Sequence, residues 1–161
     1  MTNRSKLEAL RASKLAVELS GEQCGVLSEL IDFRDLKAGD VLVKEGTRDN
    51  HLYVIVSGVV GVVRNAGSSG QTTLLTLTDG AFVDELSFMD GTAHYASLVA
   101  FGDTCVFGLD REKLESLLAT HAVIVYRVMR AIIRTVHQIQ RQLSMQSTEL
   151  SNYIYKQHGR Y

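Results

Sequence analysis

The sequence predicts an α+β protein in which an antiparallel β-roll or jelly-roll barrel lies between N-terminal helices and a long C-terminal helix. Between residues 32 and 109, short runs of Val, Ile, Leu and Thr are separated by turn residues about every ten positions, as in rolled antiparallel sheets. On either side, apolar residues recur at helical spacing. At 161 residues the chain fits one domain, with predicted segments 1–31, 32–109 and 110–161.

Local signals predict individual elements of this plan. Apolar spacing predicts an amphipathic helix over residues 5–19. A second helix begins at Ser20, because its side chain can cap the helix while Gln23, three residues later, completes a capping box. In the β region, Leu52–Val56 and Val59–Val63 flank Ser57-Gly58, which predicts a β-hairpin.

A long helix is predicted at the C-terminal end. Asp110 caps a first short helix, and beyond His121 there is no Pro, and no Gly until Gly159. Apolar residues then recur with a seven-residue period, which is typical of a coiled-coil seam between two helices. The predicted dimer seam consists of Val125, Met129, Ile132, Val136, Ile139 and Leu143. The alternative is one helix whose apolar stripe packs against its own barrel; we favour dimerisation, because the stripe continues further than a small barrel could cover.

Composition excludes several classes of protein. Hydrophobic residues make up 45% of the chain and charged residues 22%, which is ordinary for a globular protein. No apolar run reaches the length of a membrane span, and the first residues lack the apolar core of a signal peptide. Cys24 and Cys105 are far apart and lack metal-ligand spacing, so we expect reduced thiols, a cytoplasmic location and no metal site.

The net charge of −1 hides an asymmetry. Residues 121–161 carry six basic residues against one acidic residue, Glu149. Such a split is found in proteins that contact nucleic acid or membranes. We favour the alternative, a solvated helix face or a tail lying against the chain's own acidic body.

Three stretches together resemble cyclic nucleotide-binding domains. Lys37–Gly46 is similar to the opening turn of that family, Leu52–Val60 to its strand pair, and Gly80–Ser97 to its phosphate-binding cassette. The pairs Glu85-Leu86 and Asp90-Gly91 align the cassette from both sides. The resemblance covers most of the chain and implies a rolled β fold followed by a long helix.

The resemblance also implies a role for each position of the cassette. In the family, a Gly lets the backbone approach the cyclic phosphate at the start of a short helix, a Glu binds the ribose 2′-hydroxyl, and an Arg pairs with the phosphate. Glu85 keeps the ribose role here. Asp84 stands in place of the Gly, His94 in place of the Arg, and Tyr95 in place of a small hydroxyl residue. The candidate ligand-binding residues are Val83, Asp84, Glu85, Leu86, Ser87, His94, Tyr95 and Ala96.

These replacements weaken a phosphate site for physical reasons. Asp84 places a negative charge where the phosphate belongs, and like charges about 4 Å apart cost several kcal/mol. A histidine, for the most part neutral at pH 7, offers one donor in place of a charged fork, and Tyr95 brings a ring that could fill the pocket. Asp84 and His94 could instead pair across the old pocket, either as a polar pair that satisfies itself or as a proton sensor.

These residues favour a binding module over an enzyme or a DNA-binding protein. The five histidines lack the His-x-His spacing of cupin enzymes, which share the rolled architecture, and no nucleophile motif is present, so we expect no catalytic residues. The chain leaves no room for a helix-turn-helix domain after the long helix, so we expect no sequence-specific DNA binding. The leading hypothesis is a non-catalytic regulatory module, dimeric through its C-terminal helix, that no longer binds cAMP or cGMP well.

Two alternatives stay open. One is a functional cAMP or cGMP sensor, in which the ligand moves a hinge near residues 118–123 and the terminal helix. The other is a fragment of a larger transcription regulator without its DNA-binding domain. We expect a second copy and another protein as partners, no membrane contact, and no cofactor beyond cAMP or cGMP as candidate ligand.

Overall fold

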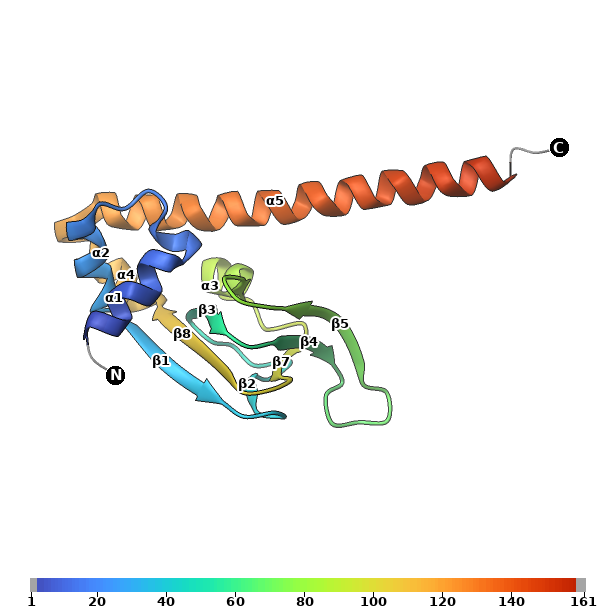
Figure 1. Cartoon of the computed structure of the whole chain (residues 1–161), viewed down its shortest axis with the longest axis horizontal. Coiled ribbons are helices and arrows are strands. Elements are labelled where there is room, and N and C mark those ends of the chain that lie inside the picture. The colour runs from blue at the N-terminus through green and yellow to red at the C-terminus, as the bar shows by residue number, and fades with distance from the viewer. Residues whose placement is uncertain (1–2, 159–161) are drawn as a thin grey trace.

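The computed structural model describes the backbone of residues 3–158 and the side chains of residues 6–149. The helices are α1 (Asn3–Ala12), the 3-10 helix η1 (Lys14–Ala16), α2 (Gly21–Ser28), α3 (Glu85–Asp90), α4 (Arg111–Ser116) and α5 (Leu118–His158). The strands are β1 (Ile31–Leu36), β2 (Val41–Val43), β3 (His51–Ser57), β4 (Val60–Arg64), β5 (Thr72–Leu77), β6 (Phe82–Val83), β7 (Ser97–Ala100) and β8 (Thr104–Asp110). The helix α5 crosses the N-terminal helices and continues past the strands (Figure 1).

The strands form two four-stranded sheets, in the orders β1-β8-β3-β6 and β2-β7-β4-β5. All strand pairs are antiparallel. Since most consecutive strands lie in opposite sheets, the chain winds back and forth between them and closes a roll. This arrangement, with helices at both ends of the chain, confirms the predicted α+β β-roll.

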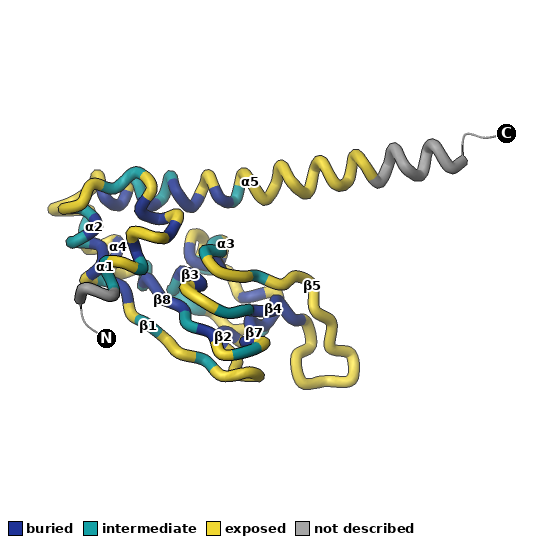
Figure 2. Tube along the Cα trace, viewed as in Figure 1, coloured by how far each residue is buried: buried dark blue, intermediate teal, exposed yellow. Residues whose placement is uncertain are grey.

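The strand β3 separates two hydrophobic clusters. Successive side chains of a strand point to opposite faces, so Leu52 and Val54 pack outward with the helices while Tyr53 and Ile55 face the interior of the roll. The outer cluster joins α1, α2, α4 and the first part of α5 to the sheet. Buried positions therefore follow β3, β8 and only the first part of α5 (Figure 2). Near the start of α5, His121 interrupts the helical backbone with φ −137° and ψ 45°.

The N-terminal helix is shorter than predicted. The residues 5–19 do not form one helix, because α1 ends at Ala12 and the chain continues as η1. The hydroxyl of Ser13 donates to the Leu10 carbonyl at 2.6 Å, and its backbone N–H donates to the same oxygen at 3.0 Å. These local bonds compete with helix continuation. The capping box of Ser20 and Gln23 at the start of α2 is confirmed, as is the Asp110 cap of α4.

The predicted hairpin at Ser57-Gly58 is wrong. The strands β3 and β4 belong to different sheets and do not pair with each other. The turn therefore carries the chain from one sheet to the other. Gly58 has φ 105°, and a Cβ at this position would lie 2.6 Å from the carbonyl oxygen of Asp103. The crossover thus requires glycine both for its backbone conformation and for lack of space.

Replacing Gly58 is expected to destabilise the protein. We expect Gly58→Ala to lower the free energy of unfolding by about 1–3 kcal/mol, because φ is positive and the added methyl group meets the backbone of Asp103. Urea denaturation measures the change. The matched control is Gly25→Ala in α2, where nothing lies within 4 Å of the new methyl group and a helical alanine should be neutral or stabilising. Equal stability of the two variants would contradict the steric role of Gly58.

The predicted seam residues divide into two groups. Val125 and Ile132 are buried in the outer cluster, and Met129 and Val136 pack against it from its edge. For Val125 and Ile132 the predicted seam is wrong and the alternative, packing of the helix against its own chain, describes the structure. Met129 and Val136 are only partly buried, so for them the seam stays a prediction. Ile139 and Leu143 lie beyond the end of that cluster, with 39% and 61% of their surface exposed. For this second half, dimerisation stays a prediction.

Candidate functional site

The cassette connects β6 to β7 and contains the short helix α3. Both ends of α3 are in the left-handed region, with φ 72° at Asp84 before the helix and φ 69° at Gly91 after it. Asp84 and Asn65 are the described non-glycine residues with positive φ. A left-handed aspartate costs about 1–2 kcal/mol relative to glycine. The backbone thus keeps the conformation of a glycine turn at a position where the sequence has an acid.

The other end of the cassette is held by the loop between β2 and β3. The backbone N–H of His94 donates to the carbonyl of Thr47 at 2.9 Å, and the N–H of Gly46 donates to the carbonyl of His94 at 2.8 Å. The backbone of His94 is therefore fixed from both sides. Its ring points into the protein, where 3% of the side chain is exposed.

Asp84 and His94 form a buried pair across the cassette. The Nδ1 atom of His94 lies 2.7 Å from Oδ1 of Asp84, and the hydroxyl of Ser87 lies 3.2 Å from the same ring nitrogen. The Asp84 side chain is 8% exposed. Among the described residues, Asp84 Oδ2 and His94 Nε2 have no hydrogen-bond partner although both are buried. The alternative in which these two side chains pair is confirmed. The pairing leaves one polar atom of each side chain without a hydrogen bond.

Burial dominates the electrostatics of this pair. Loss of solvent raises the pKa of Asp84 to about 6, against the opposing influence of the Ser87 hydrogen bond and the His94 charge. The nearby Asp49 carboxylate raises it further. Burial also raises the pKa of the Glu85 carboxyl. The cassette therefore gathers acidic groups that are costly to ionise, where the family resemblance implies an anionic ligand.

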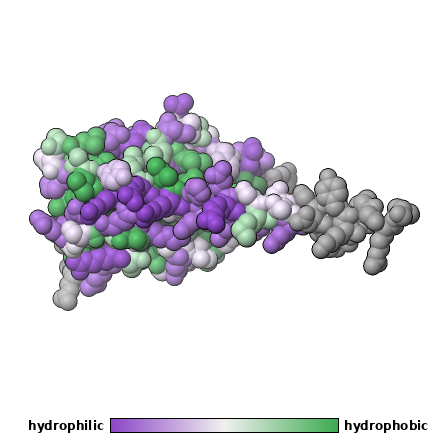
Figure 3. Space-filling model, turned by 90° about the horizontal axis from the view of Figure 1, so that it is seen from above, coloured by the Kyte–Doolittle hydropathy of each residue, from purple (hydrophilic) through white to green (hydrophobic). Residues whose placement is uncertain are grey.

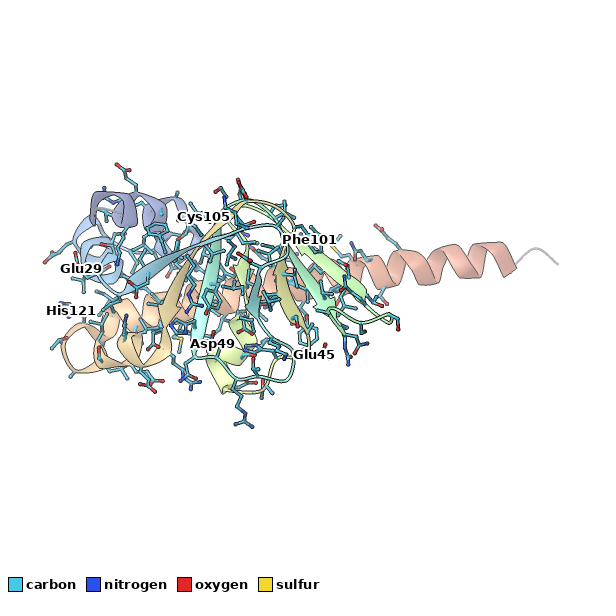
Figure 4. The ribbon with its side chains drawn as sticks, turned by 90° about the horizontal axis from the view of Figure 1, so that it is seen from below. Glu29, Glu45, Asp49, Phe101, Cys105 and His121 are labelled. Carbon is cyan, nitrogen blue, oxygen red and sulfur yellow. The ribbon has the colours of Figure 1, made fainter. Side chains whose placement is uncertain are left out.

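A second polar cluster lies beside the cassette and was not predicted. The Tyr53 hydroxyl donates to Asp49 Oδ2 at 2.7 Å, and Nδ1 of His51 lies 2.5 Å from Asp49 Oδ1. Burial, followed by the hydrogen bond to Asp49, raises the pKa of Tyr53, so its hydroxyl stays protonated. Alternation along β3 puts His51 and Tyr53 on one face, and Asp49 reaches them from the preceding loop, where its Oδ1 also accepts from the backbone N–H of His51 at 3.1 Å. Asp49 and Glu45 lie at the same end of the roll as α3 (Figure 4).

The remaining predicted site residues fall into two groups. Val83 and Ala96 are buried in the inner cluster, so they line the interior as the resemblance implies. Leu86 is exposed, and Tyr95 has 66% of its surface exposed. The expectation that the Tyr95 ring fills the site is therefore wrong: the ring points to solvent, because the adjacent His94 occupies the inward position.

The basic residues of α5 contact the chain's own body. Arg130 and Arg134 both pair with Glu18, and Arg127 donates to the Gln23 side chain at 2.7 Å. Seen from above, hydrophilic and hydrophobic side chains interleave over this side of the molecule (Figure 3). These contacts agree with the favoured interpretation of the charge asymmetry, a basic segment lying against an acidic body.

The structure also contains a cavity outside the cassette. A cavity of about 300 Å³ lies between α1 and β3, lined mainly by apolar and small side chains and by Asp79. Within the described part of the chain, no group of three His, Cys, Asp or Glu side chains has a metal-binding arrangement. The described helices include none with the length and apolar character needed to cross a bilayer.

The rolled sheets, the α3 cassette and the long helix together form the fold of a cyclic nucleotide-binding domain. The chain belongs to the cyclic nucleotide-binding domain family, which matches residues 33–121. A Pycsar effector protein from Burkholderia cepacia is 30% identical over 71% of this chain and 36% of its own length. The matched part of the chain spans between 8% and 65% of the length of these curated relatives.

Solved structures share the same fold. A cyclic nucleotide-binding domain from Methylobacillus flagellatus is 26% identical with a TM-score of 0.74, covering 87% of this chain and 79% of that one. A regulatory subunit of a cAMP-independent protein kinase A from Trypanosoma brucei has a TM-score of 0.71 and 21% identity over 90% of this chain and 49% of that one. At that identity the second likeness concerns the fold alone.

Proposed function

We propose that this chain is a non-catalytic regulatory module of the cyclic nucleotide-binding type whose site is closed to cAMP and cGMP at neutral pH. The observation that carries the proposal is the buried Asp84–His94 pair in the cassette. An ionised carboxylate at the phosphate position repels a phosphate diester, and a neutral His94 that donates from Nδ1 to Asp84 has no second N–H to offer it. A protein partner in the cytoplasm, rather than a cyclic nucleotide, would then regulate this module.

Three similar proteins support a regulatory role for this chain. Relatives of this chain include a cAMP-dependent protein kinase regulatory subunit and a cyclic AMP receptor protein. The Trypanosoma brucei subunit belongs to a kinase described as cAMP-independent, and a variant of it with three substitutions, one of them threonine to arginine, is described as bound to cAMP. That pattern supports the view that a few substitutions, an arginine among them, can decide whether such a site accepts cAMP.

Calorimetry of the wild-type protein with cAMP and with cGMP at pH 7.5 tests the closed site. We expect no binding in the micromolar range, because the ionised Asp84 opposes the phosphate charge. Micromolar affinity would overturn the proposal in favour of the alternative, a functional cyclic nucleotide sensor.

We propose further that the module is a dimer joined by the far half of α5. Ile139 follows Ile132, and Leu143 follows Val136, at seven-residue spacing, so the face that packs inside the body continues beyond it. Past the body this face is exposed (Figure 2). A second copy of the same helix would cover it, because two such stripes are complementary in an isologous pair.

Charges on this face are expected to separate the subunits. For Ile139→Asp with Leu143→Asp we expect at least a tenfold rise in the dimer dissociation constant, since each carboxylate would be buried without a partner. Sedimentation equilibrium measures it. The matched control, Gln138→Asp with Ser144→Asp, places the same charges on other exposed faces of α5 and should leave the constant unchanged. A wild-type protein that stays monomeric would refute dimerisation and leave the closed site untouched.

A further inference from the structure

The Asp84–His94 pair leaves buried polar atoms without hydrogen bonds. Its partners are Asp84 Oδ1 with His94 Nδ1, and Ser87 with the same nitrogen. Asp84 Oδ2 and His94 Nε2 remain buried without a partner in the described residues. A buried polar atom without a hydrogen bond costs about 1–3 kcal/mol. Both atoms belong to side chains more than nine-tenths buried, so the site is built to receive something more than its own two groups.

Protonation of these two side chains changes how the pair interacts with an anion. With Asp84 ionised and His94 neutral, the pair carries one negative charge and offers no donor to an anion beyond the bond already made. With both groups protonated, Asp84 becomes an uncharged donor and His94 a cation that donates from both ring nitrogens. The same atoms thus repel an anion in one state and bind it in the other.

We propose that Asp84 and His94 form a proton-operated gate, which excludes anions from the cassette at neutral pH and, once protonated, admits an anion of the phosphate class. This inference rests on the proposed function, because it takes the closed site as its neutral state. It adds that closure is reversible and that the proton is the regulating ligand.

The surroundings of the pair favour protonation. Asp49 from the loop before β3 and Glu85 from α3 are the nearby acids, and the charge of Asp49 acts on Asp84 to raise its pKa. His51 and the hydroxyl of Tyr53 are held by Asp49, while Ser87 faces the pair from α3. With burial as the largest cause, the pKa of Asp84 reaches about 6. The carboxylate therefore gains its proton at mildly acidic pH, well above the range of a solvated aspartate.

The anchoring of His94 keeps the gate in place when its charge changes. Both backbone groups of His94 are bonded to the loop that contains Gly46 and Thr47. These two bonds fix the backbone of His94, so the imidazole is attached to the same point of the cassette in both protonation states.

Calorimetric titration with inorganic phosphate and with cAMP at pH 7.5 and pH 5.5 tests the gate. Protonation of Asp84 alone, with a pKa of about 6, predicts a dissociation constant roughly 25-fold lower at pH 5.5 than at pH 7.5. Circular dichroism at both pH values verifies that the protein stays folded. Phosphate and cAMP together show whether the anion alone suffices or whether the nucleoside contributes.

Single substitutions separate the two halves of the gate. Asp84→Asn should bind phosphate more tightly than the wild type at pH 7.5, because the repelling charge is absent, and its affinity should change less between the two pH values. His94→Gln should bind more weakly than the wild type at pH 5.5, since it lacks the second ring donor and the positive charge. His137→Gln, which removes an exposed histidine of α5, is the matched control and should keep the wild-type pH dependence.

Two results would overturn the gate. Equal affinity of the wild type at both pH values would show that Asp84 and His94 do not control entry. No binding by the wild type at pH 5.5, together with binding by Asp84→Gly, His94→Arg at pH 7.5, would show a site closed by charge that protons do not open. In that second case the proposed function stands and only the gate fails.

Discussion

The double variant Asp84→Gly, His94→Arg is expected to bind cAMP at pH 7.5 at least about a hundredfold more tightly than the wild type. A hundredfold corresponds to about 2.7 kcal/mol. Removing a carboxylate about 4 Å from the phosphate accounts for that amount at an effective dielectric constant near 20. Arginine adds charged, bidentate hydrogen bonds. Glycine also suits the positive φ at position 84.

Calorimetry with cAMP, and with cGMP for comparison, measures this gain. The matched control is Asp103→Gly with His137→Arg, which makes the same two exchanges at exposed positions away from the cassette and should behave as the wild type. A folded double variant that binds neither nucleotide would contradict the view that charge closes the site. The altered shape of the cassette would then be the cause.

Asp84→Asn is expected to stabilise the protein at neutral pH by up to about 3 kcal/mol. Burial raises the pKa of Asp84 from 3.8 to about 6, so the folded state holds this proton more tightly than the unfolded chain. The stability that protonated Asp84 contributes is complete below pH 3.8 and is lost as pH rises through about 6. Asparagine keeps an uncharged group at all pH values and tolerates the left-handed backbone.

Urea denaturation of both proteins from pH 4 to pH 8 tests this dependence. The difference in the free energy of unfolding should grow between pH 4 and about pH 7 and then level off. A difference that does not change with pH would mean that Asp84 titrates as a solvated group. A less stable Asp84→Asn at pH 7.5 would mean that attraction to His94 outweighs the cost of burial.

Some side-chain positions in the cassette could be predicted from the sequence and others could not. The pairing of Asp84 with His94 was predictable, because two cassette positions that lie on either side of one phosphate must face each other. The direction of Tyr95 was not, since it depends on which of two adjacent side chains turns inward. The common face of His51 and Tyr53 could have been inferred from strand alternation, but the contact of both with Asp49 could not, because Asp49 lies in the loop before β3.

What the sequence by itself determined is local in origin: the Ser20 and Asp110 caps, the turns that bound the strands, and the periodicity of the long helix. Each depends on residues a few positions apart, so it can be predicted directly from the sequence. The tertiary structure alone decided that the Gly58 turn changes sheets and that Val125 and Ile132 face their own core. It also decided that Asp84 is buried deeply enough for its pKa to rise. Sheet membership and burial depend on segments far apart in the sequence, and desolvation arises only when those segments have packed together.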